Sequence, residues 1–372
     1  MLTLRGISLV WGAQPLTARG LVTVARIRRR TRCAMARGTV PFPRAALGAS
    51  AVIGATWWYG RWLRAQARRA SANSRIVGTR LGPVEYDLRG TGPTVLHAHG
   101  GGVGHAGWFM LGHLVEAGYR LLTPDRPGYL GTPLADNGSP TAQADLFAAT
   151  LDVLGIDRVA VVGVSAGGPA ALEFARRYPN RTAALVLVSA LTQRTPLSKA
   201  QRNSALGRLV LLRRMQDLAS SILHLAMTHA PALALRAYAR TETTYDAAGA
   251  RRFIHQILDD PTQRRQLAQL ADAIVPAHSR AAGVANDLHV QHTLTDLPLE
   301  DIAAPTLIVH SRFDGDVPYR NATHAHARIT GSELVTVHQF GHLLWWGDAV
   351  VVAQIRTGIE VFLRARLRQA KF

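Results

Sequence analysis

The feature that most constrains this chain is residues 161–168, VVGVSAGG, in which a single serine among three glycines follows an apolar run. The apolar run predicts a buried strand and the pattern over 166–178 predicts a helix, so the serine lies at a sharp strand-to-helix turn. Such a turn strains the serine backbone and leaves no room for side chains two positions before or after it. Gly163 and Gly167 occupy those two positions. The stretch therefore predicts that Ser165 is a nucleophile.

A serine nucleophile needs a base and an acid that orients the base, and the chain offers both in the expected order. His342 ends the stretch QFGH, directly after the last predicted strand, 333–337. Asp314 follows the preceding strand, 306–310, and Asp316 in the same loop is its rival. Because ligand sites of open α/β sheets form at the carboxyl ends of the strands, we expect His342 and Asp314 to meet the nucleophile there.

Two backbone N–H groups are expected to hold the negative charge that develops on a substrate carbonyl. One belongs to Ala166, the residue after the nucleophile, and the other to the glycine-rich loop 99–104, HGGGVG. Within this loop Gly101 is the first candidate and Gly102 the second. A phosphate site is the alternative use of such a loop, but the stretch lacks both the complete G-x-G-x-x-G pattern and the lysine of a phosphate-binding loop.

The histidines and the cysteine give no metal-binding pattern. The chain has 15 His and 1 Cys, and it contains no H-E-x-x-H stretch and no cysteine cluster. His97 and His99 alternate along one predicted strand, so their side chains point the same way. We expect neither a metal nor a cofactor, and the single cysteine, Cys33, excludes an internal disulfide.

Strands and helices alternate through residues 76–190, which predicts βαβ units and a mostly parallel sheet. Within this part, 84–88 is expected to be an edge strand. The alternation stops over 191–297, where Ala, Leu, Arg and Gln recur with helical periodicity. Strands return in 298–372, which ends in a helix at 349–368. We therefore predict an α/β core, formed by 76–190 and 298–372, that a helical insertion interrupts.

Residues 1–75 form a separate and strongly basic region with 14 Arg and no Asp or Glu. The segment 45–63 is almost free of charge and contains Trp57 and Trp58, and aromatic residues of this kind are typical of membrane interfaces. We keep three interpretations: a signal anchor, a helix that contacts a membrane surface, and a helix that packs on the core. The protein is accordingly expected to be cytoplasmic or membrane-associated. Met35 is an alternative start.

The net charge of +19 raises the question of a nucleic-acid partner. Most of the excess lies in 1–75 and the rest in 191–297, so the part that carries the motifs is neutral overall. The chain shows no basic patch interleaved with aromatic residues, no zinc-finger spacing and no RNA-binding aromatic motif. We expect no nucleic-acid partner.

Taken together, the motifs resemble the α/β-hydrolase fold family over residues 80–370. The resemblance rests on HGGG at 99–102, DRPGY at 125–129, GVSAGG at 163–168, a strand followed by its aspartate at 306–314, and GH at 341–342. It implies a sheet of about eight strands, with 191–297 as a helical cap over the pocket. Ser165 replaces the aspartate nucleophile of epoxide hydrolases and dehalogenases, which argues against those activities. Residues 129–132 depart from the usual pattern of the family.

The residues and the resemblance together predict a serine hydrolase. Ser165 would attack an acyl carbonyl with His342 as general base, while Asp314 holds the imidazole and water finally releases the acyl group. Because 191–297 is rich in Leu and Ala and contains Met215 and Met227, we expect a small-molecule apolar acyl substrate, a lipid-like or aromatic ester. Trp108 and Trp345 flank motif positions and are candidates for binding it.

Other uses of the same residues stay open. An acyltransferase, a peptidase or a C–C hydrolase would use the same triad, and the fold does not decide among them. A non-catalytic ligand-binding protein of this fold is a further alternative, although binding alone does not need the ordered Ser, Asp and His. The sequence carries no signal for an oligomeric state.

Overall fold

The computed structural model describes residues 44–197 and 215–367. The chain divides into two compact units, Met1–Trp62 and Leu63–Phe372. Both candidate start methionines, most of the basic extension and one part of the predicted helical insertion lie outside the described residues. The boundaries predicted for the extension, the core and the insertion stay predictions.

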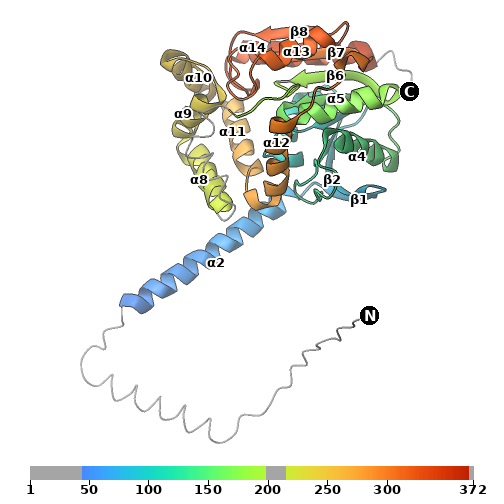
Figure 1. Ribbon diagram of the computed structural model, residues 1–372. Coiled ribbons are helices and arrows are strands. Elements are labelled where there is room, and N and C mark those ends of the chain that lie inside the picture. Colours follow the sequence, from blue (N-terminus) through green and yellow to red (C-terminus); the bar gives the residue numbers. More distant parts are fainter. Residues whose placement is uncertain (1–43, 198–214, 368–372) are drawn as a thin grey trace, which may run out of the picture. The chain divides into compact units, whose positions relative to one another are not determined.

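Eight strands form one sheet in the larger unit, in the order β1-β2-β4-β3-β5-β6-β7-β8 (Figure 1). The strands are β1 Arg75–Thr79, β2 Gly82–Arg89, β3 Thr94–Ala98, β4 Arg120–Pro124, β5 Val159–Val164, β6 Thr182–Val188, β7 Thr306–Ser311 and β8 Glu333–Val337. From β4 to β8 all neighbours are parallel, whereas β2 pairs antiparallel with both β1 and β4. The predicted α/β class with a mostly parallel eight-stranded sheet is confirmed.

The strand expected at the edge of the sheet, 84–88, lies second from the edge. It is part of β2, which pairs with β4 on one side and with β1 on the other. A tight turn joins β1 to β2, and Gly82 at its end has a φ of +118°, which glycine adopts without strain. The edge prediction was wrong because β1 is short and none of its residues is buried, so it lacks an apolar strand pattern.

Helices cover both faces of the sheet. They are η1 Gly104–Leu111, α3 Gly112–Glu116, α4 Pro140–Val153, α5 Gly168–Arg177, α13 Arg320–Arg328 and α14 Ala349–Leu367. Side chains alternate between the faces along each strand. Val162 of β5 packs in a cluster with η1, α3 and α14, and its neighbour Val161 packs in a second cluster with α4, α5 and α13. The strand that leads to Ser165 is therefore buried on both faces, which fixes the position of its carboxyl end.

Between β6 and β7 the described residues form helices and no strand, in the region predicted as a helical cap (yellow and orange in Figure 1). These helices are α8 Gln216–His229, α9 Pro231–Glu242, α10 Ala247–Asp259, α11 Pro261–Ala273 and α12 Ala281–Thr293. Two of them begin with a side-chain cap: Asp246 accepts the N–H of Gly249, and Asp260 accepts that of Thr262. We call this group of helices the cap.

Helix α2, Arg44–Ala70, covers the segment 45–63 singled out in the sequence. The side chains of Trp57 and Trp58 are exposed. Within the described ranges no single helix has both the length and the apolar character to cross a membrane, while α8 and α9, bent by 120° at their junction, pass together on length and composition. Contact of residues 1–75 with a membrane surface stays a prediction.

Candidate active site

Ser165 lies at the carboxyl end of β5, where the chain turns through a short 3₁₀ helix into α5. Its φ is +50°, in the left-handed region that is unfavourable for a residue with a side chain. A Cβ at Gly163 would lie 2.6 Å from a side chain of α5, and a Cβ at Gly167 would collide with the Ala98 carbonyl of β3. The neighbouring strand and helix therefore require both glycines, as the motif predicts.

The structure brings together the three residues predicted to carry the chemistry, although they come from the ends of three different strands. His342 Nε2 lies 2.9 Å from Ser165 Oγ, and His342 Nδ1 lies 2.9 Å from Asp314 Oδ2. All three side chains are buried. With its proton on Nδ1, the neutral imidazole can accept the serine proton on Nε2.

Hydrogen bonds favour the ionised form of Asp314. Its Oδ1 accepts the main-chain N–H groups of Asp316 and Val317 over 3.0 and 2.8 Å, and His310 Nε2 lies 3.2 Å from Oδ2. Burial alone would raise the pKa of this carboxyl, but the charge of His342 and hydrogen bonds from His310 and His342 lower the pKa of Asp314 to about 2. Asp314 is therefore a carboxylate at neutral pH and can stabilise an imidazolium.

Asp316 occupies a different place from Asp314. Its Oδ2 lies 3.4 Å from His342 Nε2, the ring nitrogen that also faces Ser165. Burial opposes the charged form of His342, but the carboxyls of Asp314, Asp316 and Glu242 outweigh it and raise the pKa of His342. Asp314 lies against Nδ1 and can therefore orient the ring, whereas Asp316 lies near Nε2 and favours the protonated form of His342.

The glycine-rich loop and the residue after the serine both line the same cavity. A Cβ at Gly101 would lie 3.9 Å from the Cβ of Ala166, which shows how close the two predicted donors stand. The N–H of Gly102 donates to Tyr129 Oη over 3.2 Å. Because that bond engages the second candidate, Gly101 and Ala166 stay the predicted pair of oxyanion donors.

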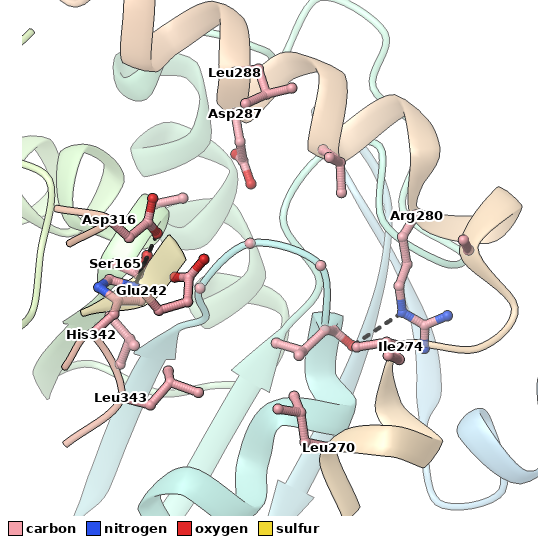
Figure 2. A pocket seen from close by; sticks show the side chains of 18 of the residues that line it. Ser165, Glu242, Leu270, Ile274, Arg280, Asp287, Leu288, Asp316, His342 and Leu343 are labelled. Carbon is pink, nitrogen blue, oxygen red and sulfur yellow. Dashed lines mark hydrogen bonds and ion pairs between the residues drawn. The ribbon is translucent and has the colours of Figure 1, made fainter. Parts of the chain in front are cut away.

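Ser165 and His342 face a cavity of about 420 Å³ that core and cap residues line together (Figure 2). The cap contributes most of the apolar wall, through Leu223, Leu270, Ile274, Val284 and Leu288. A mostly apolar cavity of this size suits a small organic molecule whose few polar groups fix its orientation.

Trp108 and Trp345 are not among the described residues that line this cavity, so the prediction that they bind substrate was wrong. The ring of Trp108 packs under a guanidinium, with the Cζ of Arg89 3.8 Å from the ring centroid. Trp345 is buried in the apolar cluster on the α14 face of the sheet. Both residues stand close to motif residues in the sequence, but packing directs their side chains elsewhere.

A buried ion pair joins the core to the cap beside the cavity. Arg126 donates to the two carboxylate oxygens of Asp287 on α12 over 2.5 and 2.7 Å, and Tyr129 Oη donates to the same carboxylate over 2.5 Å. Burial disfavours a charged guanidinium, but Asp287 more than compensates and raises the pKa of Arg126. Asp287 lines the cavity, and the sequence analysis missed it because its partners are 158 and 161 residues away in the chain.

A short part of the cap, residues 242–244, begins at the last residue of α9 and crosses the loops that follow β7 and β8. We call it the bridging segment. The carbonyl of Glu242 accepts the N–H groups of His342 and Gly315 over 2.9 and 3.1 Å, and the N–H of Thr244 donates to the loop after β7 over 2.9 Å. Cap and core therefore share main-chain hydrogen bonds at the residues on which the proposed chemistry depends.

One cluster among the described residues has the composition of a metal site: Glu85, His105 and Asp125, whose ligand atoms lie within 4.8 Å of one another. Its atoms already contact protein groups. His105 Nδ1 lies 2.8 Å from Asp125 Oδ2, His105 Nε2 lies 2.8 Å from the Ala70 carbonyl, and Glu85 accepts the N–H of Gly131. Both ring nitrogens of His105 face acceptors, which fits an imidazolium better than a metal ligand. The expected absence of a metal stays a prediction.

Comparisons with known proteins agree with this architecture. The family model of the alpha/beta hydrolase fold matches residues 93–349. The uncharacterized hydrolase YcgS of Bacillus subtilis is 30% identical over 72% of this chain and 90% of its own length. A 2-hydroxy-6-oxononadienedioate/2-hydroxy-6-oxononatrienedioate hydrolase of Cupriavidus pinatubonensis is 28% identical over 76% of this chain and 94% of its own length. Among solved structures, an alpha/beta hydrolase fold protein from Nakamurella multipartita is similar with a TM-score of 0.69 and 33% identity, and the match covers 78% of this chain and 99% of that one.

The matched region begins just before β3 and ends where α14 begins. It contains the strained serine turn, the loops after β7 and β8, and the cap. The match covers more than half of the chain, and the chain therefore belongs to the alpha/beta hydrolase fold family.

Proposed function

We propose that this protein is a serine hydrolase that cleaves a carboxylic ester through an acyl-enzyme. The observation that carries the proposal is the contact of Ser165 Oγ with His342 Nε2, 2.9 Å apart, at the wall of an apolar cavity. A hydroxyl bonded to an imidazole whose other nitrogen faces a carboxylate is the arrangement that activates a serine.

Acylation begins when Ser165 Oγ attacks the ester carbonyl while His342 Nε2 takes its proton. The carbonyl oxygen becomes an oxyanion, which the N–H groups of Ala166 and Gly101 stabilise. Asp314 stabilises the imidazolium. When the tetrahedral intermediate collapses, the bond to the alcohol oxygen breaks and the alcohol leaves with the proton from His342.

Deacylation repeats these steps with water as the nucleophile. His342 takes a proton from the water as its oxygen attacks the acyl carbon. The bond to Ser165 Oγ then breaks, Oγ recovers the proton from His342, and the carboxylic acid leaves. The chain's own residues thus carry every proton of the cycle.

Cleavage of a carbon–carbon bond is the second candidate, and the relative from Cupriavidus pinatubonensis favours it. The compound in that relative's name carries a hydroxyl, a ketone and two carboxylates, but no ester. The cavity of this chain argues for an ester. Its wall is largely apolar, and Glu242 and Asp316 line it close to the serine, where they would repel a dicarboxylate.

The proposal is tested by offering the purified protein p-nitrophenyl esters of graded chain length and, separately, 2-hydroxy-6-oxo-6-phenylhexa-2,4-dienoate, the compound named for a Burkholderia cepacia relative. We expect ester hydrolysis with a kcat/KM of about 10⁴ M⁻¹s⁻¹ or more, and at least about tenfold less for the dienoate. Faster cleavage of the dienoate than of every ester would replace the esterase proposal by the C–C hydrolase. New esters formed in the presence of an added alcohol would point to an acyltransferase.

The bridging segment leads to a prediction about Gly341. A methyl group at this position would collide with the Thr243 side chain and lie 2.6 Å from the Glu242 carbonyl. We expect Gly341→Ala to displace His342 and to lower kcat about a hundredfold, since small displacements of a catalytic group cost that much. Steady-state ester hydrolysis measures the effect, and circular dichroism shows whether the variant is folded.

Gly358→Ala is the matched control, because a Cβ at Gly358 in α14 would meet no atom within 4 Å. This variant should keep the wild-type kcat. An unchanged kcat in a folded Gly341→Ala variant would show that the bridging segment does not hold His342 in place.

A further inference from the structure

Two acidic side chains stand beside the nucleophile. Glu242 of the bridging segment and Asp316 of the loop after β7 line the cavity together with Ser165 and His342. Figure 2 shows both carboxyl groups at the same side of the cavity as the serine, while Arg280 stands at the other side. Asp316 Oδ2 lies 3.4 Å from His342 Nε2. A substrate group next to the scissile ester would therefore meet these two carboxyls.

Among the described residues, the ionisable groups in the cavity wall are Tyr238, Glu242, Arg280, Asp287, Asp316 and His342. Of the cations, protonated His342 lies against the acidic side and partly offsets its charge. Arg126 already neutralises Asp287 in the buried ion pair. The guanidinium of Arg280 donates to the main-chain oxygens of Val103 and Pro276, away from Glu242. The groups that act electrostatically on Glu242 are Asp314, Asp316 and His342, and the phenol of Tyr238 also lies within range.

Two carboxyls in a largely apolar wall are unfavourable when both are ionised, because each loses hydration and repels the other. Burial, followed by the nearby Asp316 carboxylate, raises the pKa of Glu242 to about 8. At neutral pH the pair therefore holds a proton. A positive charge brought by a ligand can take the place of this proton and attract both carboxylates at once.

The uncharged neighbours suit an alkylammonium group. Tyr238 and Leu343 line the cavity with Glu242. An aromatic ring attracts a cation through its electron-rich face, and an aliphatic side chain packs against the methyl or methylene groups that surround a quaternary or alkylated nitrogen. Carboxylates, an aromatic ring and an aliphatic side chain together form a better surface for such a cation than for a carboxylate.

We propose that Glu242 and Asp316 form a subsite, next to Ser165, that selects substrates carrying a positively charged amine or quaternary ammonium group near the scissile ester. This inference rests on the proposed serine hydrolase and names the class of its substrate. Glu242 supplies the main charge from the cap, and Asp316 adds to it from the core.

The test uses three p-nitrophenyl esters whose acyl chains differ only in the end group: 4-(trimethylammonio)butanoate, the uncharged 5,5-dimethylhexanoate and the monoester of glutarate. In the wild type we expect kcat/KM for the cationic ester to exceed that for the neutral ester at least about tenfold, with the anionic ester poorest. In Glu242→Gln the ratio of kcat/KM for the cationic ester to that for the neutral ester should fall to near one. Glu242→Asp should restore part of the preference.

Glu300→Gln is the control variant, since Glu300 pairs with Arg328 on the surface, outside the cavity wall, and its loss should leave the ratio unchanged. The ratio of cationic to neutral ester should rise with pH as Glu242 loses its proton, because titration of His342 affects both esters and cancels. In Glu242→Gln this rise should disappear.

The outcomes separate the subsite from the proposed function. If the neutral ester is cleaved but the cationic ester shows no advantage, or if its advantage survives in Glu242→Gln, the subsite is refuted and the serine hydrolase stands. If none of the three esters is cleaved by the folded protein, the proposed function fails and the subsite fails with it.

Discussion

Ser165→Ala is expected to abolish labelling by a fluorophosphonate probe and to lower ester hydrolysis by about 10⁴-fold or more, the loss typical of removing a nucleophile that acts together with its base. The probe forms a phosphorus–oxygen bond with an activated serine oxygen, and alanine has none. Labelling of the intact full-length chain, followed by gel fluorescence, measures the effect directly. The same result is expected for His342→Ala, because the hydroxyl then lacks the imidazole 2.9 Å away.

Ser220→Ala provides the matched control. Ser220 also lines the cavity, but it lies on α8 and its hydroxyl donates to the Asp217 carbonyl over 3.1 Å. Labelling should persist in this variant. If a folded wild type takes up no label, or if Ser165→Ala is labelled as strongly as the wild type, the serine mechanism is wrong and a non-catalytic ligand-binding protein becomes the better explanation.

Asp314→Asn should lower kcat by about 10³ to 10⁴-fold, whereas Asp316→Asn should keep most of the activity. The amide that replaces the Asp314 carboxylate would no longer stabilise the tautomer with the proton on Nδ1, and it would carry no charge to support the imidazolium. Asp316 faces Nε2, so its replacement leaves the orientation of the ring intact. Steady-state kinetics on one ester at several pH values compares the two variants, and a larger loss in Asp316→Asn would exchange the roles assigned to the two aspartates.

The pH dependence of the Asp316→Asn variant follows from the same geometry. His342 must be neutral to accept the serine proton, so activity rises as pH increases through its pKa. The Asp316 carboxylate helps to raise that pKa, and its removal lowers it. The acidic limb of the kcat/KM profile should therefore move to lower pH in Asp316→Asn and stay in place in the surface control Glu300→Gln.

The meeting of Ser165, Asp314 and His342 could be predicted from sequence because the signal for each residue is local. The turn at Ser165 is recognisable from two glycines and a strand, and Asp314 and His342 each follow a strand whose apolar pattern is clear. The general rule that the carboxyl ends of parallel strands lie at one edge of the sheet then places the three residues together. No long-range packing had to be known for these three residues.

The other residues around the cavity could not be predicted from sequence, because contacts between distant parts of the chain place them there. Asp287 pairs with Arg126, which lies 161 residues earlier in the chain. The sequence around either residue contains no pattern that indicates this pair. Glu242 lines the cavity because the chain at the end of α9 crosses the loops of the core, and helical periodicity does not reveal that path. The prediction that Trp108 and Trp345 bind substrate was wrong for the opposite reason. Both residues lie near the motifs in the sequence, but three-dimensional packing determines where their side chains point.

Caps of this fold are attractive modules for recombination, since they carry much of the pocket on one continuous stretch of chain. In this protein the module has a constraint at residues 242–244, whose main chain accepts the N–H groups of His342 and Gly315. A cap grafted from a relative would have to follow the same path between its helices and meet glycines at 315 and 341. Crossover points placed within α9 and α10 would leave these three residues with the recipient, so that libraries of new caps could vary specificity while inheriting an intact catalytic framework.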